Sequence, residues 1–515
     1  MERWAGTYLM IETNDYPTLS PVLSSQFSQQ TASPVLDFYL KTIEKYTHLW
    51  ISEEDVMHQV VRILSTLSKK SAVLNAMASS ERFHALVSHI LSHLSRMPAS
   101  IQSPLVKYIS NSVTHLSDPT MKETFFQDLV RVIEHRLIGI YSQAEFRKMP
   151  QNPIFMEHIT SSIEMYTGLF MSLDESNSRA IFLKCVDKFS IWVDLLDIYH
   201  TCPEIEYSIL SMFAQLAKGL YFDALSPSET QQLLQVSTEL LKRFATHETG
   251  RKIYRTQFEE EEVVNDLISV LEFLDNLMTG LFEGLPRSDI IEKLNLFGPF
   301  IQVDQVLFYN LSLVLPLFTE HMLSFPALTQ KPIHLVCHLM EYFPEKLSNL
   351  PPDVLGKLLH ALEVGLESNQ QDVLEHAFNA LSELSRNIWS LYPSPATTLA
   401  LFLDLQLDRL LTRLLFLDLR QEYLVLLYET LACLITARKN AYLETVDRVV
   451  SKQPSESREK PGLAFSNLNR ELESCISVRE NIWKGQPSLG MAGAKKFRHE
   501  WTKFLVLVRG FLRVK

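Results

Sequence analysis

The amino-acid sequence predicts an all-α protein, an α-solenoid superhelix of HEAT-type helix pairs. Glycine is scarce, with 15 in 515 residues, and leucine-rich runs dominate, which disfavours turn-rich all-β folds. Apolar stripes at helical spacing follow one another, without a clean run of period-two alternation bounded by hairpin turns. The helices pair as helix, turn, helix at intervals of about 40 to 50 residues, the spacing typical of HEAT repeats.

The elements are expected in four parts. Residues 12–34 are rich in Ser, Thr, Gln and Pro and are predicted to be a loop after a short N-terminal helix. The parts are 1–35, a truncated helix and polar loop; 36–450, the solenoid; 451–494, a polar flexible segment with a short helix; and 495–515, a capping helix. Individual solenoid helices are predicted at 80–95, 101–116, 121–140, 153–173, 179–199, 204–221, 228–246, 262–281, 303–323 and 333–343.

One step between repeats lies in the segment EYFPEKLSNLPPDVLGKLLHALEVGLES, residues 341–368. Asn349 can cap a helix, Pro351 and Pro352 suit its first turn, and Asp353 opposes the positive end of the helix dipole. Two apolar stripes are predicted on the helices that follow. They comprise Val354, Leu355, Leu358, Leu359, Leu362 and Leu366, and then Val373, Leu374, Ala377, Phe378, Leu381 and Leu384.

The last helix is predicted to be amphipathic, with basic residues outside its apolar stripe. A helix lying on a membrane surface is one interpretation, and packing onto the last repeat as a cap is the favoured one. The stripe comprises Phe497, Trp501, Phe504, Leu505, Val508, Phe511 and Leu512, and the basic residues are Lys495, Lys496, Arg498, His499 and Lys503.

Composition and charge exclude several classes of protein. The five cysteines are far apart and odd in number, as expected for buried thiols of an intracellular protein. No signal peptide is visible, and acidic and basic residues interrupt the most apolar stretch, 399–437, so a soluble protein is expected. The formal net charge of −12 favours basic protein surfaces over nucleic acid as partners.

No motif for catalysis, cofactor binding or metal binding stands out. The sequence lacks Gly-x-Ser-x-Gly, the Walker-type phosphate loop and Cys-x-x-Cys, so we expect no enzyme and no cofactor. His89 and His93 lie one helical turn apart, a spacing that can hold zinc. Without a third ligand, two histidines on a polar helix face are the favoured interpretation.

Acidic residues are the candidates for partner binding. Glu259, Glu260, Glu261 and Glu262 form a run at a predicted helix entrance, where the dipole favours negative charge. Glu363 and Glu367 form a second pair one turn apart, close to Glu375 on the next predicted helix. Each set is either a solvated helix face or an acidic patch directed at a basic partner.

A resemblance to a known family rests on residues 310–366. This segment resembles the C-terminal part of the exportin-4 family, a branch of the importin-β-like nuclear transport receptors. Weaker similarity extends through HETGRKIY upstream and LVRGFLRVK downstream, so most of the chain after about residue 35 is covered. The matching features are Leu315-Pro316-Leu317, Ser324-Phe325-Pro326, Phe343-Pro344-Glu345-Lys346 and Leu350-Pro351.

The resemblance implies a receptor that carries protein cargo through the nuclear pore without covalent chemistry. The implied partners are the hypusine-bearing translation initiation factor 5A as cargo, Ran with GTP, and nucleoporins. Shuttling between nucleus and cytoplasm follows from the same resemblance. Family members are longer than this chain, which resembles their C-terminal half and lacks a counterpart of the N-terminal repeats that grip Ran. The alternative is a cytoplasmic solenoid scaffold without a transport cycle.

Overall fold

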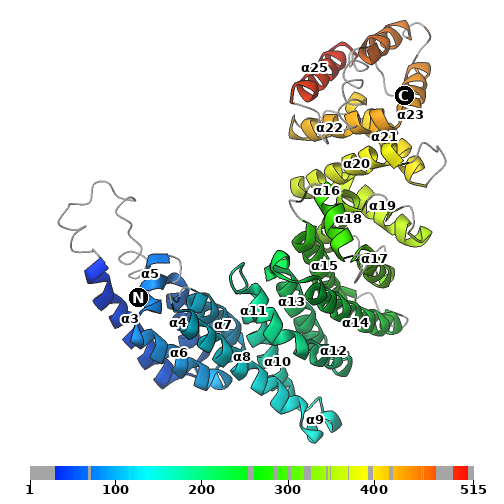
Figure 1. The fold of residues 1–515 in the computed structure, drawn as a ribbon. Helices are drawn as coiled ribbons and strands as arrows, with labels where there is room; N and C mark the ends of the chain where they lie inside the picture. Colours follow the sequence, from blue (N-terminus) through cyan, green and yellow to red (C-terminus); the bar gives the residue numbers. More distant parts are fainter. Residues whose placement is uncertain are drawn as a thin grey trace. The chain divides into compact units, whose positions relative to one another are not determined.

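A computed structural model describes the chain from residue 29 to residue 508 with gaps. The gaps are 68–70, 115, 117, 253–259, 283–284, 286, 298–302, 318–325, 344–345, 348–349, 369, 392–397, 417–420, 454, 456–457 and 471–490. Every regular element in the described ranges is a helix (Figure 1). The chain divides into two compact units, Met1–Leu317 (unit 1) and Phe318–Lys515 (unit 2).

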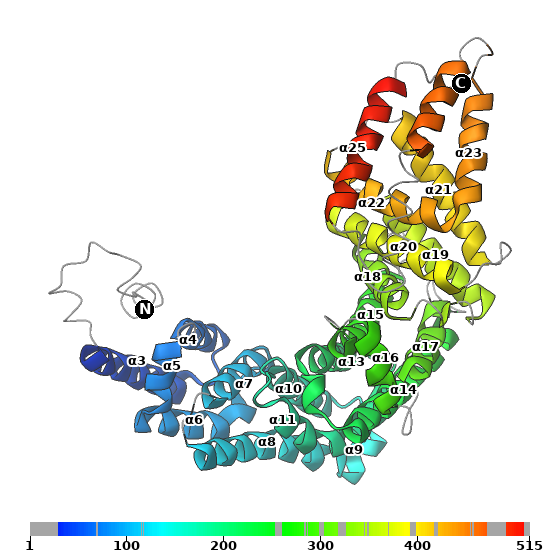
Figure 2. The same ribbon diagram turned by 45° about the horizontal axis from the view of Figure 1, so that its top comes forward.

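Unit 1 is a stack of helices in two layers (Figures 1 and 2). In layer A, α3 packs on α6, α6 on α8, α8 on α11, and α12 on α14. In layer B, α4 packs on α7, α7 on α10, α10 on α13, and α13 on α15. The helices are α3 (Gln29–Trp50), α4 (Glu54–Leu67), α5 (Ser71–Ala78), α6 (Glu81–His93), η1 (Leu94–Arg96), α7 (Ala99–Thr114), α8 (Pro119–Tyr141), α9 (Ala144–Lys148), α10 (Pro153–Phe170), α11 (Ser178–Cys185), η2 (Val186–Lys188), α12 (Phe189–Ile198), α13 (Pro203–Gly219), η3 (Phe222–Ala224), α14 (Pro227–Lys252), α15 (Glu260–Phe282), α16 (Arg287–Phe297), α17 (Val303–Val314) and η4 (Leu315–Leu317).

Unit 2 repeats the two-layer arrangement. In layer A, α21 packs on α23; in layer B, α18 packs on α20, α20 on α22, and α22 on α25. The helix α19 pairs with α20, and α21 with α22. The helices are α18 (Pro326–Tyr342), α19 (Pro352–Leu366), α20 (Gln371–Leu391), α21 (Thr398–Phe416), α22 (Gln421–Ala437), α23 (Lys439–Ser451), a helix over 459–470, and α25 (Met491–Val508). The predicted all-α solenoid is confirmed, while one continuous array over 36–450 stays a prediction.

Prolines and short polar residues begin many of these helices. Asp118 accepts a hydrogen bond from the Thr120 amide at 2.9 Å, directly before Pro119 opens α8. Asn152 accepts one from the Ile154 amide at 3.0 Å and begins α10 in the same way. These caps satisfy amides that have no partner within the helix.

The predicted step before α19 is confirmed, because this helix begins at Pro352. Asn349, its predicted cap, lies outside the described residues. The stripe predicted on α19 is buried throughout, and that on α20 is buried except for the half-buried Leu374. Because neither helix covers its stripe alone, α18, α19 and α20 pack together.

Aromatic rings fill the centre of unit 1 and connect its layers. Phe189 lies 6.3 Å from Phe170, 6.0 Å from Phe182 and 5.6 Å from Phe213, measured between ring centroids. Phe213 continues to Phe273 on α15 at 6.0 Å. All five side chains are buried, so these edge-to-face contacts fix the helices α10, α11, α12, α13 and α15 relative to one another.

A glycine permits the closest approach of two layer B helices. A Cβ atom at Gly168 of α10 would lie 2.2 Å from the carbonyl oxygen of Ser103 on α7. Two hydrogen bonds cross the same contact: Ser161 to Gln102 at 2.5 Å and Ser172 to Ser110 at 2.7 Å. The backbones meet closely here because no side chain separates them.

Several boundaries differ from the expectation. The helix α3 begins at Gln29, inside the stretch expected to be a loop. The single helix expected over 179–199 is two helices, α11 and α12, joined by η2. The break brings Cys185 and Phe189 into the core, where both are buried. In the described residues, no helix is both long and apolar enough to cross a membrane.

Candidate interaction surface

The first predicted acidic set lies at a helix start. The helix α15 begins at Glu260, so Glu260, Glu261 and Glu262 occupy its first turn. The side chains of these three residues lie outside the described part of the structure, as does Glu259 altogether. The predicted helix entrance is confirmed, and a negatively charged first turn complements the positive end of the helix dipole.

The second predicted set consists of two residues in different environments. Glu363 is 26% exposed and forms an ion pair with Arg409 of α21. It also accepts a hydrogen bond from Gln406 Nε2 at 3.2 Å, and its other oxygen lies 3.9 Å from His360 Nδ1. Glu367 follows the last turn of α19 and is exposed. Among the described residues, no cation contacts its carboxylate.

The negative charge of Glu363 is therefore compensated within the chain, whereas that of Glu367 faces solvent. Helical spacing predicts that the two residues lie one turn apart, but it does not predict that Glu363 pairs with Arg409. That cation comes from the next repeat of layer A, 46 residues later. An acidic and a basic residue separated by one repeat length are the sequence signal that predicts such a pair.

Ion pairs of this type recur between neighbouring layer A helices, and we call them the charge ladder. The carboxylate belongs to the earlier helix and the cation to the later one, in both units. One pair, Arg179 with Glu229 at 2.9 Å, runs in the opposite direction. The pairs of the ladder are Arg82 with Glu44, Lys184 with Glu123, Arg243 with Asp194, Arg409 with Glu363, and Arg448 with Asp408.

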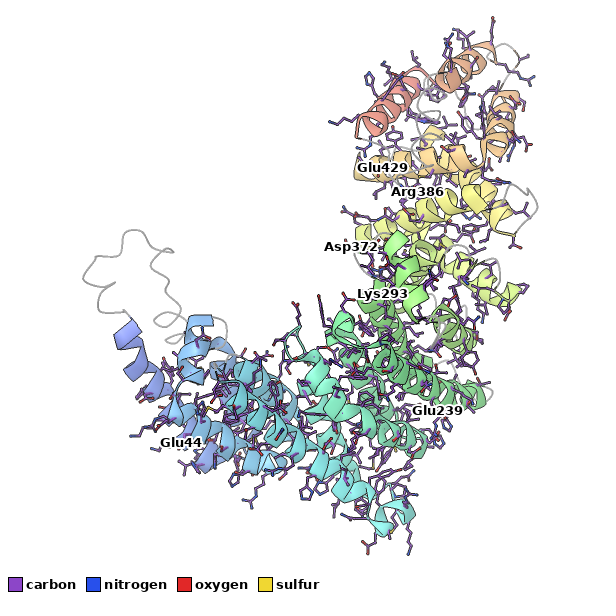
Figure 3. All side chains as sticks on the ribbon, in the orientation of Figure 1. Glu44, Glu239, Lys293, Asp372, Arg386 and Glu429 are labelled. Carbon is purple, nitrogen blue, oxygen red and sulfur yellow. The ribbon has the colours of Figure 1, made fainter. Side chains whose placement is uncertain are left out.

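The ladder side chains are partly exposed, between 25% and 51%. One of them, Glu44 on α3, is labelled in Figure 3. A single exposed ion pair contributes only about 0–1 kcal/mol to stability. We therefore expect the ladder to influence how neighbouring helices align more than it stabilises the fold. In one pair the contact also changes the acidity of the carboxylate. The hydrogen bond from Lys184 lowers the pKa of Glu123.

The densest polar cluster joins α8, α12 and α14. Arg243 lies 3.0 Å from Asp194, contacts Asp197, and lies 3.0 Å from Glu239 on its own helix. The Tyr141 hydroxyl donates to Asp194 at 2.7 Å. One guanidinium thus holds three carboxylates, which leaves the cluster net negative at its surface.

The same cluster includes a histidine pair. His247 Nε2 lies 2.7 Å from Asp197 Oδ1, and the rings of His247 and His200 stack with centroids 4.3 Å apart. A second histidine contact joins α18 to α20, where the rings of His334 and His376 are tilted by 43° with centroids 4.1 Å apart. These rings contribute flat contact surface between neighbouring helices.

His89 and His93 belong to a third group of histidine rings, which are tilted against one another. The ring of His89 lies 3.7 Å from that of His48 on α3 and 4.4 Å from that of His93. Burial lowers the pKa of His89, and the neighbouring histidines lower it further, while Glu44 opposes this. In the described ranges, no group of three or more His, Cys, Asp or Glu side chains is arranged to hold a metal ion.

Two groups that are reactive when exposed lie inside unit 1. Burial raises the pKa of the Cys185 thiol, which keeps it protonated and unreactive. Burial also raises the pKa of Tyr199 to about 12, and its hydroxyl donates to the Pro150 carbonyl at 2.7 Å. Both groups are core elements.

Comparisons with known proteins add the following. The family model described as Exportin-4 matches residues 1–469. Exportin-4 of Dictyostelium discoideum is 20% identical over 396 residues, which cover 75% of this chain and 33% of that protein. The chain thus spans about a third of the length of this curated relative.

Two solved structures are similar over most of the chain. An engineered protein from a structural genomics consortium covers 90% of this chain and 98% of its own, with 14% identity and a TM-score of 0.44. A structure from work on a phosphorylation switch between cadherin and β-catenin covers 93% and 97%, with 13% identity and a TM-score of 0.29.

Proposed function

This chain belongs to the exportin-4 family, and from that premise we propose that it is a portion of a nuclear export receptor that binds protein cargo for Ran-GTP-dependent transport. The single observation that carries the proposal is the family match over residues 1–469. The two-layer stacks of unit 1 and unit 2 support it, since stacked helix pairs provide extended binding surfaces. On this proposal the protein shuttles between nucleus and cytoplasm and also contacts nucleoporins.

The cargo that the family resemblance suggests is the hypusine-bearing translation initiation factor 5A. Hypusine is a lysine lengthened by a polyamine, so a receptor for it needs carboxylates. The net charge of −12 supports a basic cargo. Glu367, exposed and without a cation among the described residues, suits this role better than Glu363, which Arg409 already compensates. The run Glu259–Glu262 remains the second candidate.

The experiment measures association of the hypusinated factor with the chain extended to the full length of its family, with Ran and GTP present, by surface plasmon resonance at about 0.05 M and 0.15 M salt. We expect Glu367→Gln, and separately glutamine at 259 to 262, to slow association and to flatten its salt dependence, because charge complementarity acts mainly on the on-rate. Glu175→Gln, on an exposed loop of unit 1, is the matched control and should change neither.

Glu363→Gln distinguishes a cargo contact from an internal one. Since its partner Arg409 lies in the same chain, we expect a smaller change in on-rate than for Glu367→Gln. If on-rates and salt dependences are unchanged for all acidic variants, these residues form a solvated helix face and do not contact cargo. A chain that does not bind the factor at all would refute the cargo assignment.

A further inference from the structure

The side chain of Arg136 joins three elements of unit 1. It comes from α8, and its Nη1 atom donates to the carbonyl oxygen of Ser95 in η1 at 3.1 Å. Its Nη2 atom lies 2.8 Å from Nδ1 of His158 on α10. One guanidinium thus connects the layer A helix α8 to α10, with which it packs, and to the turn that ends α6 in the preceding repeat.

Neutral groups hold this cation. Arg136 is half-buried, its Nε atom is buried without a hydrogen-bond partner, and no carboxylate in the described ranges forms an ion pair with it. Burial lowers the pKa of Arg136 and Glu157 opposes this, but a guanidinium stays charged at any pH near neutrality. A carbonyl oxygen and an imidazole nitrogen therefore bind a partly desolvated positive charge.

The chemistry of the contact fixes the protonation state of His158. A guanidinium has five N–H donors and no acceptor, so the imidazole nitrogen that it contacts must accept. Nδ1 of His158 therefore carries no proton, and the ring is neutral with its proton on Nε2. A proton on Nδ1 would place two donors and two positive charges face to face. The contact with Arg136 and the protonated ring thus exclude each other.

The surroundings of the ring act in the same direction. Burial lowers the pKa of His158, and the cation of Arg136 lowers it further, while Glu157 on the same helix opposes both. The helices α7 and α13, which also pack on α10, bring no described charged group that alters it. Stability from this contact is therefore present above the ordinary histidine pKa of about 6.5 and is lost as pH falls from there through the folded value.

We propose that Arg136 and His158 form a pH-dependent latch between two neighbouring repeats, closed while His158 is neutral and open once it is protonated. When the latch opens, repulsion moves the guanidinium out into solvent, and the hydrogen bond to Ser95 is lost together with the contact to α10. The turn between α6 and α7 is then no longer tied to α8 at this point. The latch acts on the helix stack whether or not the chain carries cargo.

Two substitutions fix the latch in its two states. In His158→Asn the side-chain Oδ1 takes the place of the imidazole Nδ1 and accepts from Arg136 without titrating, so the latch should stay closed at every pH. In His158→Lys a permanent cation faces Arg136, so the latch should stay open. The matched control is His135→Asn, which removes an exposed histidine of α8.

Amide hydrogen exchange followed by mass spectrometry measures the latch locally. Protection factors, the ratio of intrinsic to observed exchange rates, remove the effect of pH on the exchange chemistry itself. In the unaltered chain and in His135→Asn, protection of peptides from η1 and from the C-terminal half of α8 should fall about threefold or more between pH 7.5 and pH 5.5. In His158→Asn it should change less, and in His158→Lys it should already be low at pH 7.5. Peptides from α22 provide the internal reference.

Two outcomes of this experiment would overturn the proposal. One is a protection that does not fall in the unaltered chain, and the other is a fall that His158→Asn reproduces in full. The second outcome would assign the pH dependence to other histidines of unit 1.

A second measurement works on the unaltered chain and does not depend on exchange. NMR of the protein with isotope-labelled histidine reports the tautomer and the pKa of His158. We expect the proton on Nε2 at pH 7.5, and we expect Arg136→Gln to raise the pKa of His158, because it removes the neighbouring cation. A proton on Nδ1 at pH 7.5, or a pKa that Arg136→Gln leaves unchanged, would contradict the latch.

Discussion

The helices α3 and α25 are the first and last described helices, and they attach to their units in different ways. The helix α25 buries Trp501, Phe504 and Val508 against its neighbours, and Arg498 pairs with Glu429 of α22. Figure 3 shows Glu429 on that helix. The helix α3 buries Leu36, Tyr39, Leu40 and Ile43 but exposes Phe38 and Leu49 on its opposite side, next to lysines that no described carboxylate contacts.

This difference shows that the burial of apolar side chains, rather than their number, distinguishes how the two helices are attached. Both helices have exposed apolar residues. On α25 these are the aliphatic Val506 and Leu507, whereas the aromatic Trp501 and Phe504 of the same helix are buried. On α3 the aromatic Phe38, Tyr46 and Trp50 are themselves exposed. Each prediction below tests one part of this contrast, beginning with the largest expected effect.

The two tryptophans give the clearest contrast. Trp501→Ala should destabilise unit 2 by about 3–5 kcal/mol, because it removes a fully buried indole. Trp50→Ala should change the stability of unit 1 by no more than about 0.5 kcal/mol, because half of that side chain is already exposed. Hydrogen exchange of peptides from α22 and α4, followed by mass spectrometry, measures each unit separately. Equal effects in the two units would remove the contrast.

The stack that supports α3 depends on the contact of α7 with α10. Gly168→Ala should destabilise unit 1 by about 1–3 kcal/mol, because the added methyl group overlaps the Ser103 carbonyl oxygen. Gly139→Ala is the matched control on α8, where no atom lies within 4 Å of the added Cβ. It should stabilise by about 0.5–1 kcal/mol through helix propensity. Urea unfolding gives both values, and a neutral Gly168→Ala would contradict the close approach.

The attachment of α3 to α6 should weaken in acid. The pKa of His89 is lowered in the folded state, so the unfolded chain takes up this proton first. Stability is therefore present above the ordinary histidine pKa of about 6.5 and is lost as pH falls from there through the folded value. His48, His93 and Glu44 are the charged or titratable groups that act on this ring.

The His89→Gln variant tests this pH dependence. Its urea midpoint for unit 1 should fall less between pH 7.5 and pH 5.5 than that of the unaltered chain. Peptides from α22 and α25 serve as the internal reference, because their exchange should be the same in both proteins. A steeper loss of stability in the variant would reverse the sign of the argument.

The sequence predicted much of the fold because its signals are local. The start of α19 follows from Pro351 and Pro352, and the stripes of α19 and α20 follow from helical periodicity alone. The break between α11 and α12 has no glycine or proline to mark it, and it is set by how Cys185 and Phe189 enter the core. Tertiary packing determines such helix boundaries, and the periodicity of apolar residues in the sequence does not predict them.

The candidate surface was less predictable, because its chemistry depends on contacts between repeats. Glu363 and Glu367 have the same residue type and share a helix face in the sequence, yet only Glu363 meets Arg409. Such properties arise from the stacking of helices that lie about 40 to 50 residues apart in the chain.

The most direct test of the proposed transport function is the dependence of cargo binding on the nucleotide bound to Ran. The measurement is the equilibrium affinity for hypusinated translation initiation factor 5A of the chain extended to the full length of its family, with Ran-GTP and with Ran-GDP at equal concentration. The account predicts binding that Ran-GTP strengthens at least tenfold, about 1.4 kcal/mol, and that Ran-GDP leaves unchanged. Cargo binding that ignores the nucleotide would contradict it and would instead indicate a scaffold without a transport cycle.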